Sequence, residues 1–367
     1  MGRAYWQMLN LAPLLLALAA PLSNAADPTP EHEALAQRVD AVVVAAMADP
    51  AAVGLSVSVA LGDEIILTRG YGLAEVEHDV RADGDTTFRI GSITKQFTAA
   101  AVMRLFEQEM LHVDEDMCVY LPDYPAAEEV VTIRNLLTHT SGIPSYTDLG
   151  PVFWENMAIH MTHEELLATF VDLPLSFPPG QRWAYNNSGY YLLGMVIESI
   201  SGKTYAEYLQ AELFEPLGLE SMRYGSNSAL IKNRAQGYRM SEGELHNDEL
   251  LSMNPPGAAG ALLACAGDLV RWQLALVSGK VVSEESYIEM TTPFMLTDMT
   301  ETNYGMGLQL GERSGRTLVS HGGGISGFNS FLAHLPQEGL SVAVISNCED
   351  FSAQGVANDI LTAALEQ

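Results

Sequence analysis

Apolar and polar residues follow one another along the chain in two patterns, one with the period of a helix and one with the period of a strand. Helical spacing, as at Leu35, Val39 and Val43, predicts amphipathic helices because residues three and four apart share one face. Short apolar runs bounded by Gly, Asp or Pro predict strands. The predicted helices cover residues 31–48, 92–110, 134–139, 164–171, 189–200, 205–213, 268–276, 284–291 and 353–365. The predicted strands cover residues 54–61, 65–73, 88–90, 305–310, 317–321, 330–334 and 341–346.

The order of these elements puts strands at both ends of the chain and helices in the middle. It predicts an α+β fold, an α/β sandwich in which N- and C-terminal segments share one antiparallel sheet with flanking helices. Residues of about 30–105 and 265–367 would form this sheet lobe, and residues of about 106–264 an inserted, mostly helical lobe. No Pro/Ser-rich linker divides the chain, so residues 26–367 are expected to form a single domain with a ligand site between the lobes.

The first 25 residues differ in composition from the rest. Arg3 gives a positive start, residues 9–22 are apolar, and Ser23-Asn24-Ala25 supplies small residues at the cleavage positions. This pattern is typical of a secretory signal peptide over residues 1–25. We therefore expect a periplasmic or secreted protein with no stable membrane span after cleavage. An uncleaved anchor is the alternative reading.

Charge and composition exclude several classes of protein. The 367 residues include 18 Lys and Arg against 46 Asp and Glu, a formal net charge of −28. Such a surface repels phosphates and anionic lipids, so neither nucleic acid nor a membrane surface is expected as a partner. Hydrophobic residues make up 48% of the chain, which excludes intrinsic disorder. The oligomeric state is left open.

The cysteines and histidines give no metal-binding pattern. Cys118, Cys265 and Cys348 are odd in number, so they do not form a disulfide framework, although one pair could bridge in an oxidising compartment. We expect buried free thiols. His160 and His163 have helical spacing but lack a third ligand and are expected at the surface. Neither a metal nor a cofactor is expected.

The strongest chemical signal is Ser92-Ile93-Thr94-Lys95. Residues three apart lie on one face of a helix, so the Ser92 hydroxyl and the Lys95 amine can meet. Gly91 lets the chain turn sharply into this helix. An ammonium in a helix that is almost uncharged is costly to bury, so the pKa of Lys95 is expected to fall until it can take a proton from Ser92. A snorkelling lysine beside an N-cap serine is the alternative.

A second signal is Tyr185-Asn186-Asn187, which follows a Pro-Pro-Gly turn and precedes a helix. A phenol near a lysine ammonium can be held ionised or strongly hydrogen-bonded and act as a general base. Asn187 could donate to a substrate carbonyl while it contacts the lysine. A tyrosine that only packs in its loop is the alternative.

A third signal is His321-Gly322-Gly323-Gly324, expected to close the strand at 317–320. Three glycines let a ligand approach the strand edge and leave N–H groups free to bind it. A flexible hairpin turn is the alternative.

Ser-x-x-Lys, Tyr-x-Asn and His-x-Gly, in this order, resemble the penicillin-recognising serine hydrolases. These are the class C β-lactamases and their D-alanyl-D-alanine carboxypeptidase, D-aminopeptidase and esterase relatives. Segments 136–144, 177–180 and 257–262 also resemble that family, and the resemblance runs from about Ala34 to the C-terminus. It implies a β-lactamase/transpeptidase-like fold. His139, inside the first of these segments, is expected to fix its loop by a hydrogen bond rather than to take part in catalysis.

The resemblance implies a role for each motif residue. Ser92 would be the acylated nucleophile, Lys95 would shuttle or hold protons for it, and Tyr185 would be the general base that then protonates the leaving group. Asn187 would help to place the substrate amide and Lys95.

The third motif would supply the substrate-facing strand. The N–H groups of Gly324 and Ser92 would form the oxyanion hole. Gly323 would belong to the same substrate edge, and His321 would line it opposite Tyr185.

One departure from class C β-lactamases bears on the substrate. Where those enzymes have Lys-Thr-Gly, this chain has His321-Gly322-Gly323, which removes a cation and a hydroxyl that favour a β-lactam or a C-terminal carboxylate. We therefore expect a secreted serine hydrolase that forms an acyl-enzyme on Ser92 and cleaves small esters or D-amino acid amide or peptide bonds. Its substrate would be a small molecule or derived from peptidoglycan. A class C-like β-lactamase and a catalytically silent binding protein of the same fold are the alternatives.

Overall fold

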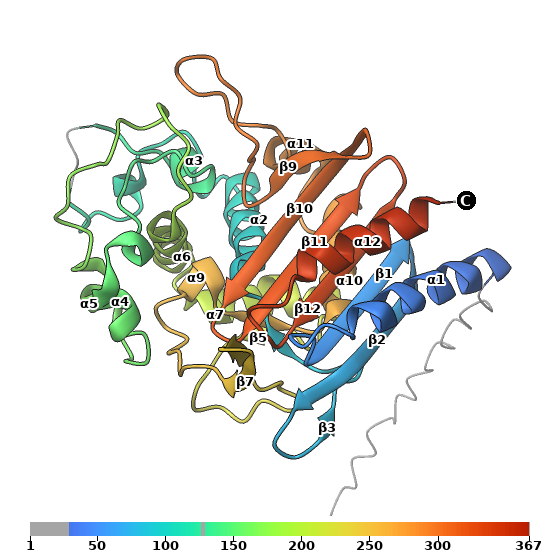
Figure 1. Cartoon of the computed structure of the whole chain (residues 1–367). Helices are drawn as coiled ribbons and strands as arrows, with labels where there is room; N and C mark the ends of the chain where they lie inside the picture. The colour runs from blue at the N-terminus through green and yellow to red at the C-terminus, as the bar shows by residue number, and fades with distance from the viewer. Residues whose placement is uncertain (1–28, 126–128, 367) are drawn as a thin grey trace, which may run out of the picture.

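A seven-stranded antiparallel sheet joins the two ends of the chain in the computed structural model, which describes residues 29–125 and 129–366. The strand order β3-β2-β1-β12-β11-β10-β9 puts N-terminal strands beside C-terminal ones (Figure 1). β1 (Gly54–Leu61) pairs with β12 (Leu340–Ser346) at every position from Leu55 to Leu61. The predicted α+β fold is confirmed. The predicted signal peptide lies outside the described residues, and the lobe boundaries stay a prediction.

The remaining strands complete this sheet and add two small ones. The large sheet also contains β2 (Glu64–Glu75), β3 (Val80–Arg81), β9 (Gln309–Arg313), β10 (Arg316–Ile325) and β11 (Phe328–Leu335). The small sheets contain β4 (Phe88–Arg89), β5 (Arg223–Tyr224) and β8 (Leu262–Ala264), and β6 (Tyr238–Ser241) and β7 (Glu244–Asn247).

Helices cover both faces of the large sheet (Figure 1). On one face α1 (Pro30–Ala46) and α12 (Ala353–Leu365) bury their apolar sides against β1, β11 and β12. On the other face α2 (Thr94–Glu107) and α10 (Ala266–Val277) belong to a second, larger core that continues into the helical part of the chain. Because both its faces are covered, β12 is buried along its whole length. The central strands of the sheet are therefore held rigidly, and they fix the position of the residues at its edge.

The other helices follow between these elements. They are α3 (Ile133–Leu137), α4 (Pro151–Glu155), α5 (His163–Leu167), α6 (Asn187–Ser201), α7 (Tyr205–Leu209), α8 (Glu215–Leu217), α9 (Gly257–Gly260) and α11 (Glu284–Met290). Short 3-10 or π turns lie at η1 (Gly91–Ile93), η2 (Met117–Val119), η3 (Tyr146–Asp148) and η4 (Gln210–Phe214).

Two strand predictions near the C-terminus are corrected. The strand expected at 305–310 begins only at Gln309, because Gly307 adopts a left-handed φ of 72° and the chain turns there. A Cβ at Gly307 would lie 2.8 Å from the Lys95 carbonyl oxygen, so this turn packs against α2. The strand at 317–321 does not close at its glycines, because β10 continues to Ile325 and pairs with β11 throughout.

The glycines of β10 have different surroundings. A Cβ at Gly323 would collide with the Ile90 carbonyl oxygen and the Ser330 hydroxyl oxygen. That hydroxyl donates to the Ile90 carbonyl at 2.8 Å, so the strand end before Ser92 lies directly on β10. A Cβ at Gly324 would have nothing within 4 Å. Gly323 is therefore required by packing, whereas Gly324 faces open space.

This difference predicts opposite outcomes for two alanine substitutions. Gly323→Ala should lower the free energy of unfolding by roughly 1–3 kcal/mol, because the added methyl group overpacks the contact with Ile90. The matched control Gly324→Ala should change it by less than about 0.5 kcal/mol. Urea unfolding monitored by circular dichroism measures both values. Equal losses in the two variants would contradict this account of Gly323.

Candidate active site

The three sequence motifs lie together where α2, α6 and β10 meet. Ser92 lies in η1, Lys95 in the first turn of α2, and Asn187 at the start of α6. Gly91 makes the turn into η1 with a φ of 49°, and a Cβ there would be 3.0 Å from the Gly324 amide nitrogen. Ser92 thus lies in a 3-10 turn that leads into the helix, rather than in the first turn of the α-helix itself.

Lys95 is the most heavily bonded side chain of this site. Its Nζ donates to Ser92 Oγ at 3.1 Å, to Asn187 Oδ1 at 2.8 Å and to the Ala259 carbonyl oxygen at 2.8 Å. The residue has no exposed surface. Three acceptors match the three N–H groups of an ammonium, whereas in the neutral amine two N–H groups remain and the lone pair can accept from the Ser92 hydroxyl.

Burial shapes the proton affinity of this lysine. Loss of hydration disfavours the charged form and lowers the pKa of Lys95 well below its usual value. The described chain places no carboxylate in hydrogen-bond or ion-pair contact with its Nζ to oppose this shift. Burial thus favours the neutral form, and in that form the amine can accept a proton from Ser92 Oγ across their hydrogen-bond distance of 3.1 Å.

Tyr185 contacts Lys95 through the face of its ring and not, as the sequence predicts, through its hydroxyl. The Lys95 Nζ lies over the face of the Tyr185 ring, 4.7 Å from its centroid. The phenol oxygen is buried without a hydrogen bond of ordinary geometry. Burial raises the pKa of Tyr185, and the nearby Ser92 hydroxyl opposes this only in part. The resting phenol is thus protonated, rather than ionised by the lysine.

Asn187 connects the lysine to the helical part of the chain. Its Oδ1 accepts from Lys95, so its Nδ2 faces the other way and donates to Thr147 Oγ1 at 3.0 Å. Its backbone N–H donates to Ser145 Oγ at 3.2 Å. These bonds fix the amide orientation, and the loop at 145–147 becomes a wall of the site.

His321 is buried and held by two partners. Its Nε2 lies 2.9 Å from the Tyr304 hydroxyl and its Nδ1 lies 2.6 Å from the Gly322 carbonyl oxygen. A carbonyl can only accept, so Nδ1 carries the hydrogen and Nε2 accepts from Tyr304. Burial, with the Lys95 charge, lowers the pKa of His321 to about 3. His321 is therefore neutral, and both of its nitrogens are engaged within the protein.

The edge of β10 is open beside the serine. β9 pairs with β10 only from Arg316 to Ser320, so the strand from His321 to Ile325 has no β9 partner on that side. Gly324 is exposed and lines a hollow of about 100 Å³ together with Ser92. The other walls of this hollow are mostly apolar, with Tyr146, Phe153 and Trp154 among them. An extended group could lie along this edge with its reacting carbon at Ser92.

Several residues at the site were not predicted from their sequence pattern. Tyr304 lies in a loop, Thr147 in η3 and Ala259 in α9, and only the fold brings them to His321, Asn187 and Lys95. The loop role expected for His139 was signalled by its place between two threonines. Its Nδ1 accepts from the Asn186 N–H at 3.1 Å.

Cysteines and metal ligands add nothing to the site. Cys118, Cys265 and Cys348 are free, and Cys118 is only half-buried. Among residues 29–125 and 129–366 there is no group of three His, Cys, Asp or Glu side chains that could hold a metal ion. No helix in that part of the chain is both long enough and apolar enough to span a bilayer.

Comparisons with known proteins agree with this fold. The chain is 27% identical over 334 residues to the D-aminopeptidase of Gluconobacter oxydans, which covers 91% of this chain and 63% of that protein. Among solved structures, a D-stereospecific amidohydrolase from Streptomyces sp. superposes with a TM-score of 0.76 at 28% identity, over 90% of this chain and 98% of that one. A penicillin binding protein from Bacillus halodurans gives 0.77 at 29% identity, over 88% and 98%.

The fold and these relatives define a serine hydrolase. The Beta-lactamase family matches the chain over residues 39–366, and the protein belongs to this family.

Lys95→Met tests whether burial lowers the pKa of this lysine. Above the lowered folded-state pKa and up to about 10.4, the unfolded chain binds a proton that folded Lys95 does not. The free energy of unfolding of the wild type should therefore rise with pH in this range through Lys95, and this rise should be missing from Lys95→Met. Urea unfolding at a series of pH values measures it. Lys280→Met, at an exposed position, is the control and should keep the rise. An unchanged slope in Lys95→Met would contradict the account.

Proposed function

We propose that this protein is an acyl-transferring hydrolase that uses Ser92 as its nucleophile and prefers short, uncharged acyl esters. The observation that carries the proposal is the buried Lys95 amine 3.1 Å from Ser92 Oγ. A serine hydroxyl is a weak nucleophile at its own pKa, and a neutral amine within hydrogen-bond reach activates it. The amine is buried, and Ser92, which it contacts, lines the hollow at the free edge of β10.

The proposed reaction has two steps. Ser92 Oγ attacks the substrate carbonyl as its proton passes to Lys95 Nζ, and the N–H groups of Ser92 and Gly324 receive the oxyanion. The bond from the acyl carbon to the leaving oxygen or nitrogen breaks, and that atom takes a proton delivered through Tyr185. Water then attacks the ester on Ser92, gives a proton back to the same groups and releases the acid.

The acyl group is expected to be small. The hollow beside Ser92 measures about 100 Å³, well below the volume of about 300 Å³ at which sites for drug-sized ligands begin. Its aromatic and aliphatic walls favour an apolar chain. A two- to four-carbon acyl group suits such a hollow better than the bicyclic body of a cephalosporin.

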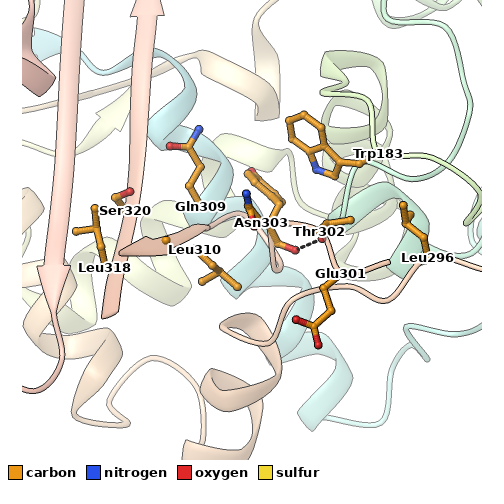
Figure 2. Close-up of a pocket in the computed structure, with 11 residues that line it drawn as sticks. Trp183, Leu296, Glu301, Thr302, Asn303, Gln309, Leu310, Leu318 and Ser320 are labelled. Carbon is orange, nitrogen blue, oxygen red and sulfur yellow. Dashed lines mark hydrogen bonds between the residues drawn. The ribbon is translucent and has the colours of Figure 1, made fainter. Parts of the chain in front are cut away.

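The surroundings of the β10 edge disfavour a carboxylate. Both nitrogens of His321 are engaged, so no cation stands where class C enzymes have a lysine. A separate, larger cavity of about 510 Å³ is lined by Ser320 and Trp183 among others (Figure 2). The only charged residue in its lining is Glu301, an anion. Neutral or cationic leaving groups are therefore preferred over those that end in a carboxylate.

D-amino acid amides are the second candidate substrates. Two relatives support them by name, the D-aminopeptidase and the D-stereospecific amidohydrolase. The leaving group of an amino acid amide carries no carboxylate, so it needs no cation to bind it. This agrees with a neutral His321 at this edge of the site. Secretion to the periplasm or beyond is proposed on the signal-peptide pattern at residues 1–25 alone.

Ser92→Ala tests the nucleophile. Loss of the hydroxyl should lower kcat for p-nitrophenyl butyrate by roughly a thousandfold or more, while the melting temperature stays close to that of the wild type. A fluorescent phosphonate should label the wild type and the control Ser228→Ala, whose serine is exposed, but not Ser92→Ala. Labelling of Ser92→Ala, or turnover near the wild-type rate, would refute the assignment.

A substrate series tests the preference. The kcat/KM values should fall from p-nitrophenyl acetate and butyrate, through D-alanine p-nitroanilide, to a chromogenic cephalosporin. The carboxylate alone is isolated by a matched pair, D-alanyl-D-alanine and D-alanyl-D-alaninamide, in which the neutral amide should be cleaved faster. Cephalosporin turnover above ester turnover would favour the class C-like alternative instead, and preference for the free acid would show that the site binds carboxylates.

A further inference from the structure

His139 follows α3 in a backbone conformation that its residue type rarely adopts. Its φ is 59°, in the left-handed region where side chains other than glycine are uncommon. It is almost completely buried, at 1% exposure. Such a conformation persists where surrounding contacts over-determine it, and these contacts gather at functional sites. The contacts of His139 point to one neighbour.

That neighbour is Tyr185, because His139 accepts hydrogen bonds from the residues before and after it in the chain. The backbone N–H of Ala184 donates to the His139 carbonyl oxygen at 2.9 Å. The N–H of Asn186 donates to His139 Nδ1 at 3.1 Å. The two residues that flank Tyr185 are thus both bonded to a single histidine. The left-handed turn aims its carbonyl and its ring at the same loop.

The imidazole also packs against the phenol itself. The ring centroids of His139 and Tyr185 are 4.4 Å apart, and Tyr304 and Tyr190 lie at 4.7 and 5.0 Å on its other sides. Among the described residues, the Tyr185 hydroxyl has no hydrogen bond of ordinary geometry to keep it in place. Its position therefore depends on backbone bonds and ring packing, and His139 supplies both.

The hydrogen-bond pattern requires His139 to stay neutral. Nδ1 accepts from Asn186, so the ring hydrogen is on Nε2, and protonation would turn Nδ1 into a donor facing a donor. Burial, and the nearby Lys95 and His321, lower the pKa of His139 well below its usual value. The groups around its ring are Lys95, His321 and the tyrosines 185, 190 and 304, with no carboxylate among the described contacts. Nε2 is buried without a hydrogen-bond partner among the described residues.

We propose that His139 is the positioning residue for Tyr185, and that its neutral imidazole and its left-handed turn set where the phenol oxygen lies relative to Ser92. This inference rests on the proposed function, in which Tyr185 carries the proton to the leaving group. His139 itself lies behind the phenol and needs no contact with the substrate. Its bond with Asn186 would extend its influence to Asn187, the next residue along.

Substitution of His139 by Gly and by Asn separates positioning from simple structural support. Glycine keeps the left-handed backbone but removes the ring, whereas asparagine tolerates a positive φ and offers an acceptor oxygen close to the place of Nδ1. His139→Gly should lower kcat for p-nitrophenyl butyrate by roughly 10- to 100-fold, because a small misplacement of a reacting group has effects of this size, with KM changed less than threefold. His139→Asn should recover much of that loss.

A matched control is available in β11. His334 is also a buried, neutral histidine, with Nδ1 3.0 Å from Ser341 Oγ and a pKa lowered by burial to about 4. It lies four residues along the strand from Ser330, which pairs with Gly323. His334→Gly should lower the melting temperature and leave kcat unchanged at a temperature well below unfolding. If His139→Gly behaved in the same way, His139 would be a structural residue only.

A double-mutant cycle with Tyr185→Phe links the effect to the phenol. If His139 acts through Tyr185, adding His139→Gly or His139→Asn to Tyr185→Phe should lower kcat by less than twofold more. A full additional loss would overturn the proposal. Should His139→Gly fail to fold, the smaller loss of kcat in His139→Asn is measured in its place, and that loss should disappear in the Tyr185→Phe background. Failure of the proposed function has a different signature, because Tyr185→Phe or Ser92→Ala would then leave kcat unchanged.

Discussion

The buried amine of Lys95 is the constraint on which the rest of the site depends. Removing an ammonium from water is costly, and the protein offsets this with three acceptors taken from three parts of the chain: Ser92, Asn187 and the Ala259 carbonyl. Each acceptor ties one segment to the first turn of α2. The chain turn at Gly307 packs on the backbone of Lys95 and Gln96, in the first turn of α2. The hydrogen bonds that fix the lysine therefore also define the walls of the cleft.

The same amine sets the charge state of its surroundings. His139 and His321 are both buried near it, and when the amine is protonated its charge lowers the pKa of each beyond the effect of burial. Basic groups this close cannot all hold protons, so the histidines stay neutral and act through fixed lone pairs and ring faces. A cluster that is basic in composition thus behaves as a neutral, preorganised site. That state suits transfer of one proton at a time between Ser92, Lys95 and the leaving group.

The sequence predicted the parts of this site that depend on short spacing. Ser92 and Lys95 are three residues apart, and helical geometry alone places them together. The loop role of His139 also followed from its local pattern, whereas the role of Gly324 was implied only by the family resemblance. What failed depended on contacts distant in the chain. The strand did not end at the glycines, because pairing with β11 carries β10 on to Ile325. The Lys95 amine lies on the ring of Tyr185 rather than at its hydroxyl, because Asn187 and Ala259 take its donors first.

The fold also separates two reasons for glycine that look alike in the sequence. Gly323 is required because Ile90 and Ser330 occupy the space of a side chain, and this contact presses the strand end before Ser92 onto β10. No described residue occupies the space of a side chain at Gly324, and the proposed function places the substrate there. At the edge of the sheet a tightly packed residue, Gly323, is therefore followed directly by an open one, Gly324. The same short segment of β10 backbone, Gly323 and Gly324, holds Ser92 in place and leaves room for a substrate carbonyl beside it in the proposed reaction. Neither residue has a charged side chain. Under the proposed function, selectivity would come from the apolar hollow at Tyr146 and Phe153 and from the strongly acidic surface, both of which would disfavour an anionic substrate.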